Sequence, residues 1–159
     1  PPRSTLFPYT TLFRSRVREI LGQIKAKAIL FSELTPAKAA MADVLIIDSI
    51  GLLNRLYQYA TVAFIGGGFG SGLHNIQEPV TFGVPVFFGP VFRKFREATD
   101  LVSRGGAFPV KSADELQEKM NFLLETTGAY QNASGICRRY VKENIGATEK
   151  IIGFIGELR

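Results

Sequence analysis

Short apolar runs alternate with segments of helical periodicity from residue 16 onward. The runs are Ala28–Phe31, Val44–Ile47, Thr61–Ile65, Val84–Phe88 and Ala107–Val110. A short apolar run bounded by turn residues is typical of a strand buried on both faces, and such strands alternating with helices form a parallel sheet. The pattern predicts a single α/β domain with a Rossmann-like parallel sheet and helices on both faces. Ligands of such sheets bind beyond the carboxyl ends of the strands.

Apolar residues at helical spacing, with start and stop signals, predict the helices between these runs. The expected helices are Val17–Ile24, Leu52–Tyr59, Asn75–Phe82, Arg93–Ser103, Ser112 to about Thr126, about Tyr130–Glu143 and Thr148–Leu158, and Ser32–Met41 is expected to be a connection. Ser112 and Glu115 have the spacing of a capping box, in which the two side chains satisfy backbone amides at the start of a helix.

Composition excludes several classes of protein. The chain has one cysteine, Cys137, and no apolar run approaching the roughly 20 residues needed to span a bilayer. Neither an internal disulfide nor a secretory signal is indicated, so a cytosolic setting is expected. The formal net charge is +5, but the basic residues are scattered and do not interleave with aromatic residues. Nucleic acid is therefore not an expected partner.

Residues 1–15 differ from the rest of the chain. Thr5–Ser15 reads TLFPYTTLFRS, which has neither helical nor strand periodicity and matches the translation of a common DNA-sequencing adapter. We interpret residues 1–15 as an adapter artefact, expected to be disordered, and residues 16–159 as the domain; a natural disordered arm is the alternative. Without residues 1–15 the net charge falls from +5 to +3, because Arg3 and Arg14 are removed with no acid.

A glycine cluster follows the third apolar run. Five glycines occupy the seven positions Gly66–Gly72, between a predicted strand and a predicted helix. Glycines there let the backbone approach a ligand closely and direct amides at an anion, so Gly67 and Gly68 are expected to support a phosphate-binding loop. The spacing does not match the dinucleotide-binding fingerprint. A tight turn between strand and helix is the alternative interpretation.

Polar residues at the start of the following helix are the next candidates. Glu78 is expected in the first helical turn, where its carboxylate interacts favourably with the helix dipole and is suited to accept hydrogen bonds from ribose hydroxyls. Asn75 is well placed as the N-cap of this helix. His74, the only histidine, is interpreted as a loop residue, and no cluster with metal-ligand spacing accompanies it. Cys137 is interpreted as a core residue.

The segment Asp48–Pro90, DSIGLLNRLYQYATVAFIGGGFGSGLHNIQEPVTFGVPVFFGP, resembles the signature region of 3-deoxy-D-manno-octulosonic acid (Kdo) transferases. The similarity is greatest to the GGGFG version of Bacteroidetes-like members. It is strong over Ala42–Val110 and weaker over the terminal helices. The order of Gly-Leu-Leu, glycine-rich turn, H-N-x-x-E and G-V-P-V-x-x-G-P is specific for the family, whereas the separate motifs are not.

The resemblance implies the donor-binding C-terminal half of a GT-B glycosyltransferase that is inverting and metal-independent and needs no cofactor. The family's donor is CMP-Kdo and its acceptor is a lipid A precursor. The resemblance assigns the nucleotide contacts to two groups of residues: Gly51, Leu52 and Leu53, and Asn75, Ile76, Gln77 and Glu78. Many members have an acid at the position of Leu52, so a backbone contact is expected there.

The resemblance also implies what lies outside the matched region. The catalytic base, the acceptor site and the membrane contact are expected in an N-terminal domain, so no catalytic residue is assigned to this chain. The full-length protein is expected at the cytoplasmic face of the bacterial inner membrane. The first strand of the donor domain is expected to be missing, because residues 1–15 occupy its place, and the fragment alone is expected to be inactive.

Three other functions remain open at this stage. A GT-B transferase that uses a UDP-sugar has a similar glycine-rich loop and glutamate. A dinucleotide oxidoreductase is disfavoured by the glycine spacing. A non-enzymatic nucleotide-binding module is the third possibility.

Overall fold

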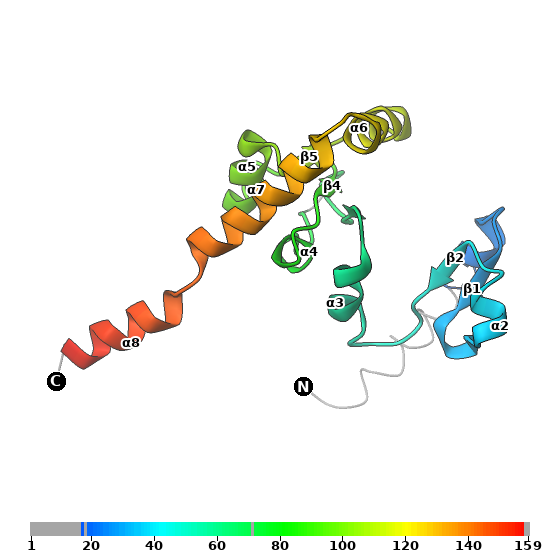
Figure 1. The fold of residues 1–159 in the computed structure, drawn as a ribbon, viewed down its shortest axis with the longest axis horizontal. Helices are drawn as coiled ribbons and strands as arrows, with labels where there is room; N and C mark the ends of the chain where they lie inside the picture. The colour runs from blue at the N-terminus through cyan, green and yellow to red at the C-terminus, as the bar shows by residue number, and fades with distance from the viewer. Residues whose placement is uncertain (1–16, 18, 71, 158–159) are drawn as a thin grey trace. The chain divides into compact units, whose positions relative to one another are not determined.

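A computed structural model describes residues 17, 19–70 and 72–157, and the chain divides into two compact units, Pro1–Leu53 and Asn54–Arg159. Figure 1 shows the helices and strands of both units. The interpretation of residues 1–15 as an artefact lies outside the described residues, and so does the predicted C-terminal end of the last helix at Leu158.

The first unit contains a pair of parallel strands, β1 (Ala28–Leu30) and β2 (Val44–Ile46). Between them lie a 3-10 helix, η2 (Phe31–Glu33), and a short helix, α2 (Pro36–Ala39). The Thr35 hydroxyl accepts a hydrogen bond from the Lys38 amide, and Pro36 occupies the first turn, so α2 has both a cap and a favourable start. Residues 32–41, predicted to be an irregular connection, therefore include helical turns.

The second unit contains a parallel sheet with the strand order β3-β4-β5. Its strands are β3 (Ala63–Phe64), β4 (Val86–Phe88) and β5 (Ala107–Pro109), and its other elements are η3 (Tyr57–Tyr59), α4 (Gln77–Thr81), α5 (Arg96–Arg104), α6 (Ala113–Glu125), α7 (Ala129–Asn144) and α8 (Ala147–Glu157). A short helix, α3 (Leu53–Leu56), begins at the boundary between the units. The predicted alternation of strands and helices is confirmed, with element ends shifted by one to three residues.

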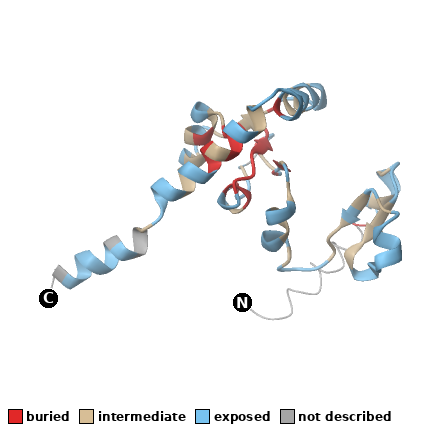
Figure 2. Ribbon diagram, in the orientation of Figure 1, coloured by how far each residue is buried: buried red, intermediate tan, exposed pale blue. Residues whose placement is uncertain are grey.

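The core of the second unit has two parts, because alternate residues of a strand point to opposite faces of a sheet. Val86 and Phe88 belong to a cluster with residues of α4, α5 and α7, whereas Phe87 belongs to a cluster with residues of α6 and α7. All three residues of β4 are fully buried, and Figure 2 shows the buried positions concentrated on this strand and the helices around it. The prediction of a parallel sheet with helices on both faces is confirmed.

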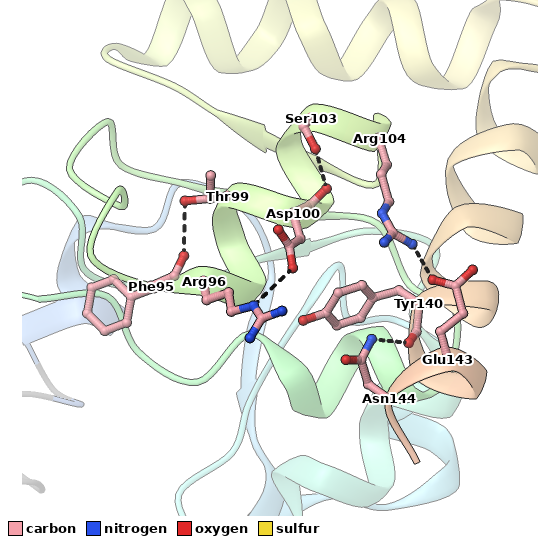
Figure 3. Close-up of polar contacts among 9 residues, drawn as sticks. All are labelled: Phe95, Arg96, Thr99, Asp100, Ser103, Arg104, Tyr140, Glu143 and Asn144. Carbon is pink, nitrogen blue, oxygen red and sulfur yellow. Dashed lines mark hydrogen bonds and ion pairs between the residues drawn. The ribbon is translucent and has the colours of Figure 1, made fainter. Parts of the chain in front are cut away.

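The contacts between α5 and α7 are polar as well as apolar. Figure 3 shows the Arg104 guanidinium paired with the Glu143 carboxylate, and the same guanidinium lies 5.7 Å from the centre of the Tyr140 ring. The Asn144 side-chain amide donates to the Tyr140 carbonyl oxygen at 2.8 Å. The contacts of Arg104 join the end of α5 to the second half of α7, whereas the Asn144 bond lies within α7. Leu101 of α5 and Ile136 of α7 belong to the same apolar cluster.

The structure shows how two predicted helix starts are capped. Ser112 caps α6 as expected, since its hydroxyl accepts from the Glu115 amide at 3.2 Å. The Glu115 carboxylate, however, accepts from the amide of Lys111 at 2.7 Å, one residue before the cap. The residue directly before α4, Ile76, already has helical dihedral angles and makes no side-chain cap, whereas the Asn75 side-chain oxygen accepts from the Gln77 amide at 2.9 Å, so Asn75 caps this helix as predicted.

No helix among the described residues is long and apolar enough to cross a membrane.

Candidate functional site

The glycine-rich loop after β3 folds back on itself. Gly67 and Gly68 have positive φ values of 94° and 78°, a region that L-residues with a side chain rarely adopt. The Gly68 amide donates to the Gly72 carbonyl oxygen at 2.7 Å, and Gly67 forms an antiparallel bridge with Leu73. The His74 amide donates to the Gly66 carbonyl oxygen at 3.1 Å, which closes the loop.

This loop is packed against the loop after β4 without intervening side chains. A Cβ atom added at Gly68 would lie 2.8 Å from the Gly89 carbonyl oxygen, and one added at Gly89 would lie 2.3 Å from the Gly68 carbonyl carbon. The Val91 amide donates to the Gly68 carbonyl oxygen at 2.8 Å. The glycines are therefore required by the contact between two loops at the carboxyl ends of neighbouring strands. A role for Gly67 and Gly68 in binding phosphate stays a prediction.

Asn75 connects the end of this loop to the first turn of α4. Its side-chain oxygen accepts from the Gln77 amide at 2.9 Å, and its side-chain nitrogen donates to Glu78 Oε1 at 3.1 Å. Asn75 thus caps the start of this helix, and it holds the Glu78 carboxylate there. Since the helix dipole favours negative charge there, this position suits a carboxylate.

The predicted contact residues in this turn differ in exposure. Asn75 and Gln77 are exposed, and Glu78 is partly buried. Ile76, in contrast, is 1% exposed and its side chain packs in the core with Val80. A ligand contact at Ile76 would have to be made by its backbone. The structure brings Asn75, Gln77 and Glu78 together at one exposed turn.

Tyr57 adds a group that the sequence did not indicate. It lies in η3, which contacts α4, and its ring packs against the cluster that contains Ile76 and Val80. Burial and, to a lesser degree, the negative charge of Glu78 raise the pKa of the Tyr57 phenol. Nothing in the spacing of Tyr57 and Glu78 signals this proximity, because it depends on how η3 packs on α4.

The other predicted group, Gly51, Leu52 and Leu53, lies in the first unit. Gly51 has a φ of 88°, Leu52 is partly buried, and Leu53 is 54% exposed. These residues follow Asp48, whose carboxylate accepts from the Ser32 amide at 3.0 Å and also from the Ser32 hydroxyl. Asp48 therefore joins the loops that follow β1 and β2. The two predicted groups of contact residues lie in different units, and the structure defines the geometry of each group only within its own unit.

Two further residues are placed as expected. His74 lies in the loop before α4, and Cys137 is fully buried in the core. Burial raises the pKa of the Cys137 thiol to about 11, and its Sγ lies 3.4 Å from the Gly106 carbonyl oxygen. A thiol with this pKa is protonated at neutral pH and is not a nucleophile. Across residues 17, 19–70 and 72–157, no three His, Cys, Asp or Glu side chains are grouped as metal ligands would be.

The first unit also has an open cavity of about 360 Å³. Its lining comprises Leu21, Lys27, Ala28, Ile29, Leu30, Glu33, Lys38, Met41 and Ala42. None of the predicted donor-site residues is among them, so the cavity is separate from the predicted contacts at Gly51–Leu53.

The fold is that of a known nucleotide-sugar-binding domain. The structure superposes on the C-terminal CMP-Kdo binding domain of WaaA from Acinetobacter baumannii with a TM-score of 0.63. The match covers 80% of this chain and 68% of that domain at 22% sequence identity, a level at which the likeness establishes the fold alone. The fold class is thus the α/β fold of that domain, a parallel sheet with helices on both faces.

Sequence comparison identifies the family that the chain resembles. The chain is 38% identical over 84 residues to the Kdo transferase of Aquifex aeolicus and 35% identical over 91 residues to that of Chlamydophila psittaci. A longer match, 117 residues at 29% identity, covers 72% of the chain and involves the Kdo transferase of Rickettsia typhi. No protein-family profile matches the chain. The resemblance to Kdo transferases is confirmed, and the chain spans about a quarter of the length of these relatives, 21–25%.

Proposed function

We propose that this chain is the donor-binding part of a Kdo transferase and that it binds CMP-Kdo through its cytidine monophosphate moiety. The observation that carries the proposal is the similarity to several Kdo transferases, up to 38% identity, over about half the chain. The acceptor would be a lipid A precursor, and the full enzyme would act at the cytoplasmic face of the inner membrane.

The residues at the start of α4 would recognise the nucleoside. The Glu78 carboxylate, held on one side by Asn75, is suited to accept hydrogen bonds from the ribose hydroxyls. Gln77 is exposed beside it, and Ile76 would contribute its backbone. For the first unit taken by itself, the resemblance predicts further nucleotide contacts at Gly51, Leu52 and Leu53, with a backbone contact at Leu52.

The phosphate would be held near the glycine-rich loop. CMP carries a single phosphate, and backbone amides at strand ends and helix starts stabilise such a leaving group. Gly67 and Gly68 would set the shape of this region, since the Gly68 amide already donates to Gly72 within the loop. We propose on this basis that transfer needs no metal ion, and, from the resemblance to Kdo transferases, that it is inverting.

The remaining catalytic groups would come from the rest of the enzyme. The relatives are about four times as long as the matched part of this chain, and transfer needs a general base and an acceptor held against the donor. We therefore expect the chain alone to bind CMP and to show no Kdo transfer to a lipid A precursor. Measurable turnover by the chain alone would contradict this division of roles.

The test of the donor site is calorimetric titration of the chain with CMP, with UMP as the competing nucleotide. Glu78→Ala is expected to weaken CMP binding by about 1–3 kcal/mol, the cost of removing charge-assisted hydrogen bonds. His74→Ala is the matched control, four residues away in the preceding loop, and should change binding much less. Preference for UMP would favour a UDP-sugar donor, and a larger loss with His74→Ala than with Glu78→Ala would contradict the site.

A further inference from the structure

Two half-exposed aromatic rings lie together at the carboxyl end of β3. Phe64 is the last residue of this strand, and Phe69 follows in the glycine-rich loop. Their rings stack with centroids 6.4 Å apart and an angle of 29° between the ring planes. Phe64 is 49% exposed and Phe69 is 56% exposed, and neither belongs to the two core clusters of the described residues. The pair is therefore an apolar surface that the second unit does not cover.

The backbone holds Phe69 at the tip of the glycine-rich loop. The Gly68 amide donates to the Gly72 carbonyl oxygen at 2.7 Å, and the Gly68 carbonyl oxygen accepts from the Val91 amide at 2.8 Å. A Cβ atom added at Gly89 would lie 2.7 Å from Cδ2 of Phe69, so the edge of the ring rests directly on this backbone. Phe69 is thus positioned by its loop and by the loop after β4, although its ring is half exposed.

The loop leaves open space beside the aromatic pair. A Cβ atom added at Gly66 or Gly70 would meet no heavy atom of the described residues within 4 Å. The base of the loop, where the His74 amide donates to the Gly66 carbonyl oxygen, leads to α4 and Glu78, whereas Phe69 leaves the loop at its tip. In a nucleotide-sugar the phosphate lies between the ribose and the sugar. A donor with its ribose at Glu78 and its phosphate at the loop would therefore bring its sugar to the tip.

Resting on the proposed function, we propose that Phe69, supported by Phe64, binds the Kdo ring of the donor. The face of an aromatic ring is negative and attracts the C–H groups of a sugar ring. Kdo is a 3-deoxy sugar, so its C3 methylene carries no hydroxyl. A phenyl ring can cover this methylene without removing a hydroxyl from water, which would cost free energy. Phe69 would thereby favour a 3-deoxy sugar over one with a hydroxyl at this carbon.

The first test compares two ligands, CMP-Kdo and CMP, by calorimetric titration of the whole chain. Phe69→Ala is expected to weaken CMP-Kdo binding about three- to tenfold, the scale of one aromatic contact, and CMP binding less than about twofold. Phe122→Ala is the matched control, because Phe122 is 60% exposed on α6, and it should change neither dissociation constant. Phe69→Leu keeps an apolar side chain and should give a smaller loss with CMP-Kdo. Phosphorus NMR checks that CMP-Kdo is intact during the titration.

The two ligands separate this inference from the proposed function. If the unmodified chain does not bind CMP, the proposed function fails. If it binds CMP and Phe69→Ala weakens both ligands equally, Phe69 acts only through the shape of the loop, and this inference alone is overturned. Unchanged CMP-Kdo binding by Phe69→Ala would also overturn it, because the aromatic pair would then be covered by another part of the enzyme.

The second test detects the contact directly. With CMP-Kdo bound to the whole chain, saturation of the aromatic protons of the protein is transferred to nearby ligand protons and is measured by NMR. The C3 methylene protons of Kdo should receive saturation, and Phe69→Ala should reduce it relative to the ribose protons. A purely structural role of Phe69 would lower both signals together. An unchanged ratio of the two signals in Phe69→Ala would overturn the inference even where CMP-Kdo binds.

Discussion

The two units carry comparable strands with unequal burial. In the second unit all three residues of β4 are fully buried, whereas β1 and β2 in the first unit contain no fully buried residue and Leu45 is 41% exposed. Among the described residues of the first unit, Val17 alone is buried, while the second unit holds two clusters of buried apolar side chains. Parallel strands are ordinarily covered on both faces, and only the second unit meets that condition.

The units also hold their strand-end loops by different means. In the first unit, Asp43 accepts from the Lys27 amide at 3.1 Å, and Asp48 accepts from the amide and hydroxyl of Ser32. In the second unit, direct backbone packing of Gly68 on Gly89 holds the loops. Exposed hydrogen bonds contribute less to stability than close packing, so the helix start that carries Glu78 should be more rigidly supported within its unit than the Gly51–Leu53 loop is within its own.

The largest expected difference between the units is in the stability lost when a strand side chain is truncated. Phe87→Ala removes a fully buried ring that stacks on Phe108 with centroids 5.2 Å apart, and should destabilise the second unit by about 3–5 kcal/mol. Leu45→Ala, at a half-exposed strand position of the first unit, should cost less than about 1 kcal/mol. Urea unfolding followed by circular dichroism measures both changes. Equal losses would show that burial does not distinguish the units.

The second difference concerns glycines with positive φ. Gly68→Ala must move the Gly89 backbone as well as adopt a strained conformation, and should cost about 2–4 kcal/mol. Gly51→Ala has a similar φ, 88°, but no heavy atom within 4 Å of the added Cβ, and should cost about 1–2 kcal/mol. Thermal unfolding of the two variants tests this order. A larger loss for Gly51→Ala would place the tighter loop in the first unit.

The periodicity of the sequence was sufficient to predict the class of fold. Apolar runs located the five strands of the described residues, and the Ser112 cap marked the start of α6 correctly. These features are local, because an apolar run and a cap depend on their own segment of the chain. The exact ends of β3 were not predictable, since they depend on which residues pair with β4.

The tertiary contacts of the candidate site were the part that sequence did not predict. Glycine-rich composition indicated a tight loop but not that Gly68 would meet Gly89, which belongs to a different strand-end loop. Glu78 was predicted in the first helical turn, yet the Asn75 side chain that bonds it belongs to the preceding loop, and η3, which carries Tyr57, packs on the same helix. Such proximity is set by packing between elements and has no fixed spacing along the chain.

A smaller effect is expected from matched helix caps. Ser112 caps the thirteen-residue α6, and Thr35 caps the four-residue α2. Ser112→Ala should destabilise the second unit by about 1 kcal/mol, and Thr35→Ala should cost about 0.5 kcal/mol, because its bond to Lys38 is longer at 3.3 Å and the helix it supports has no buried residue. Urea midpoints measure both variants. A larger effect at Thr35 would show that local hydrogen bonds order the first unit more strongly than packing does.

The smallest expected effect on stability comes from a surface charge of the second unit, Glu115. The Lys119 ammonium, which contacts Glu115 Oε1 at 2.7 Å, and the Lys111 amide hold the pKa of the Glu115 carboxyl below its usual value of 4.5. Because this pKa is depressed in the folded state, the carboxylate adds stability above pH 4.5, and the contribution is lost as pH falls through the folded pKa. Glu115→Gln should therefore lower Tm slightly and by a constant amount between pH 5 and 8, and the difference from the unmodified chain should shrink as the pH falls below 4.5. A difference that did not shrink on acidification would assign the effect of Glu115 to packing of its side chain. A Tm loss at pH 7 as large as that of Phe87→Ala would remove the contrast between a core-stabilised second unit and its weakly contributing surface charges.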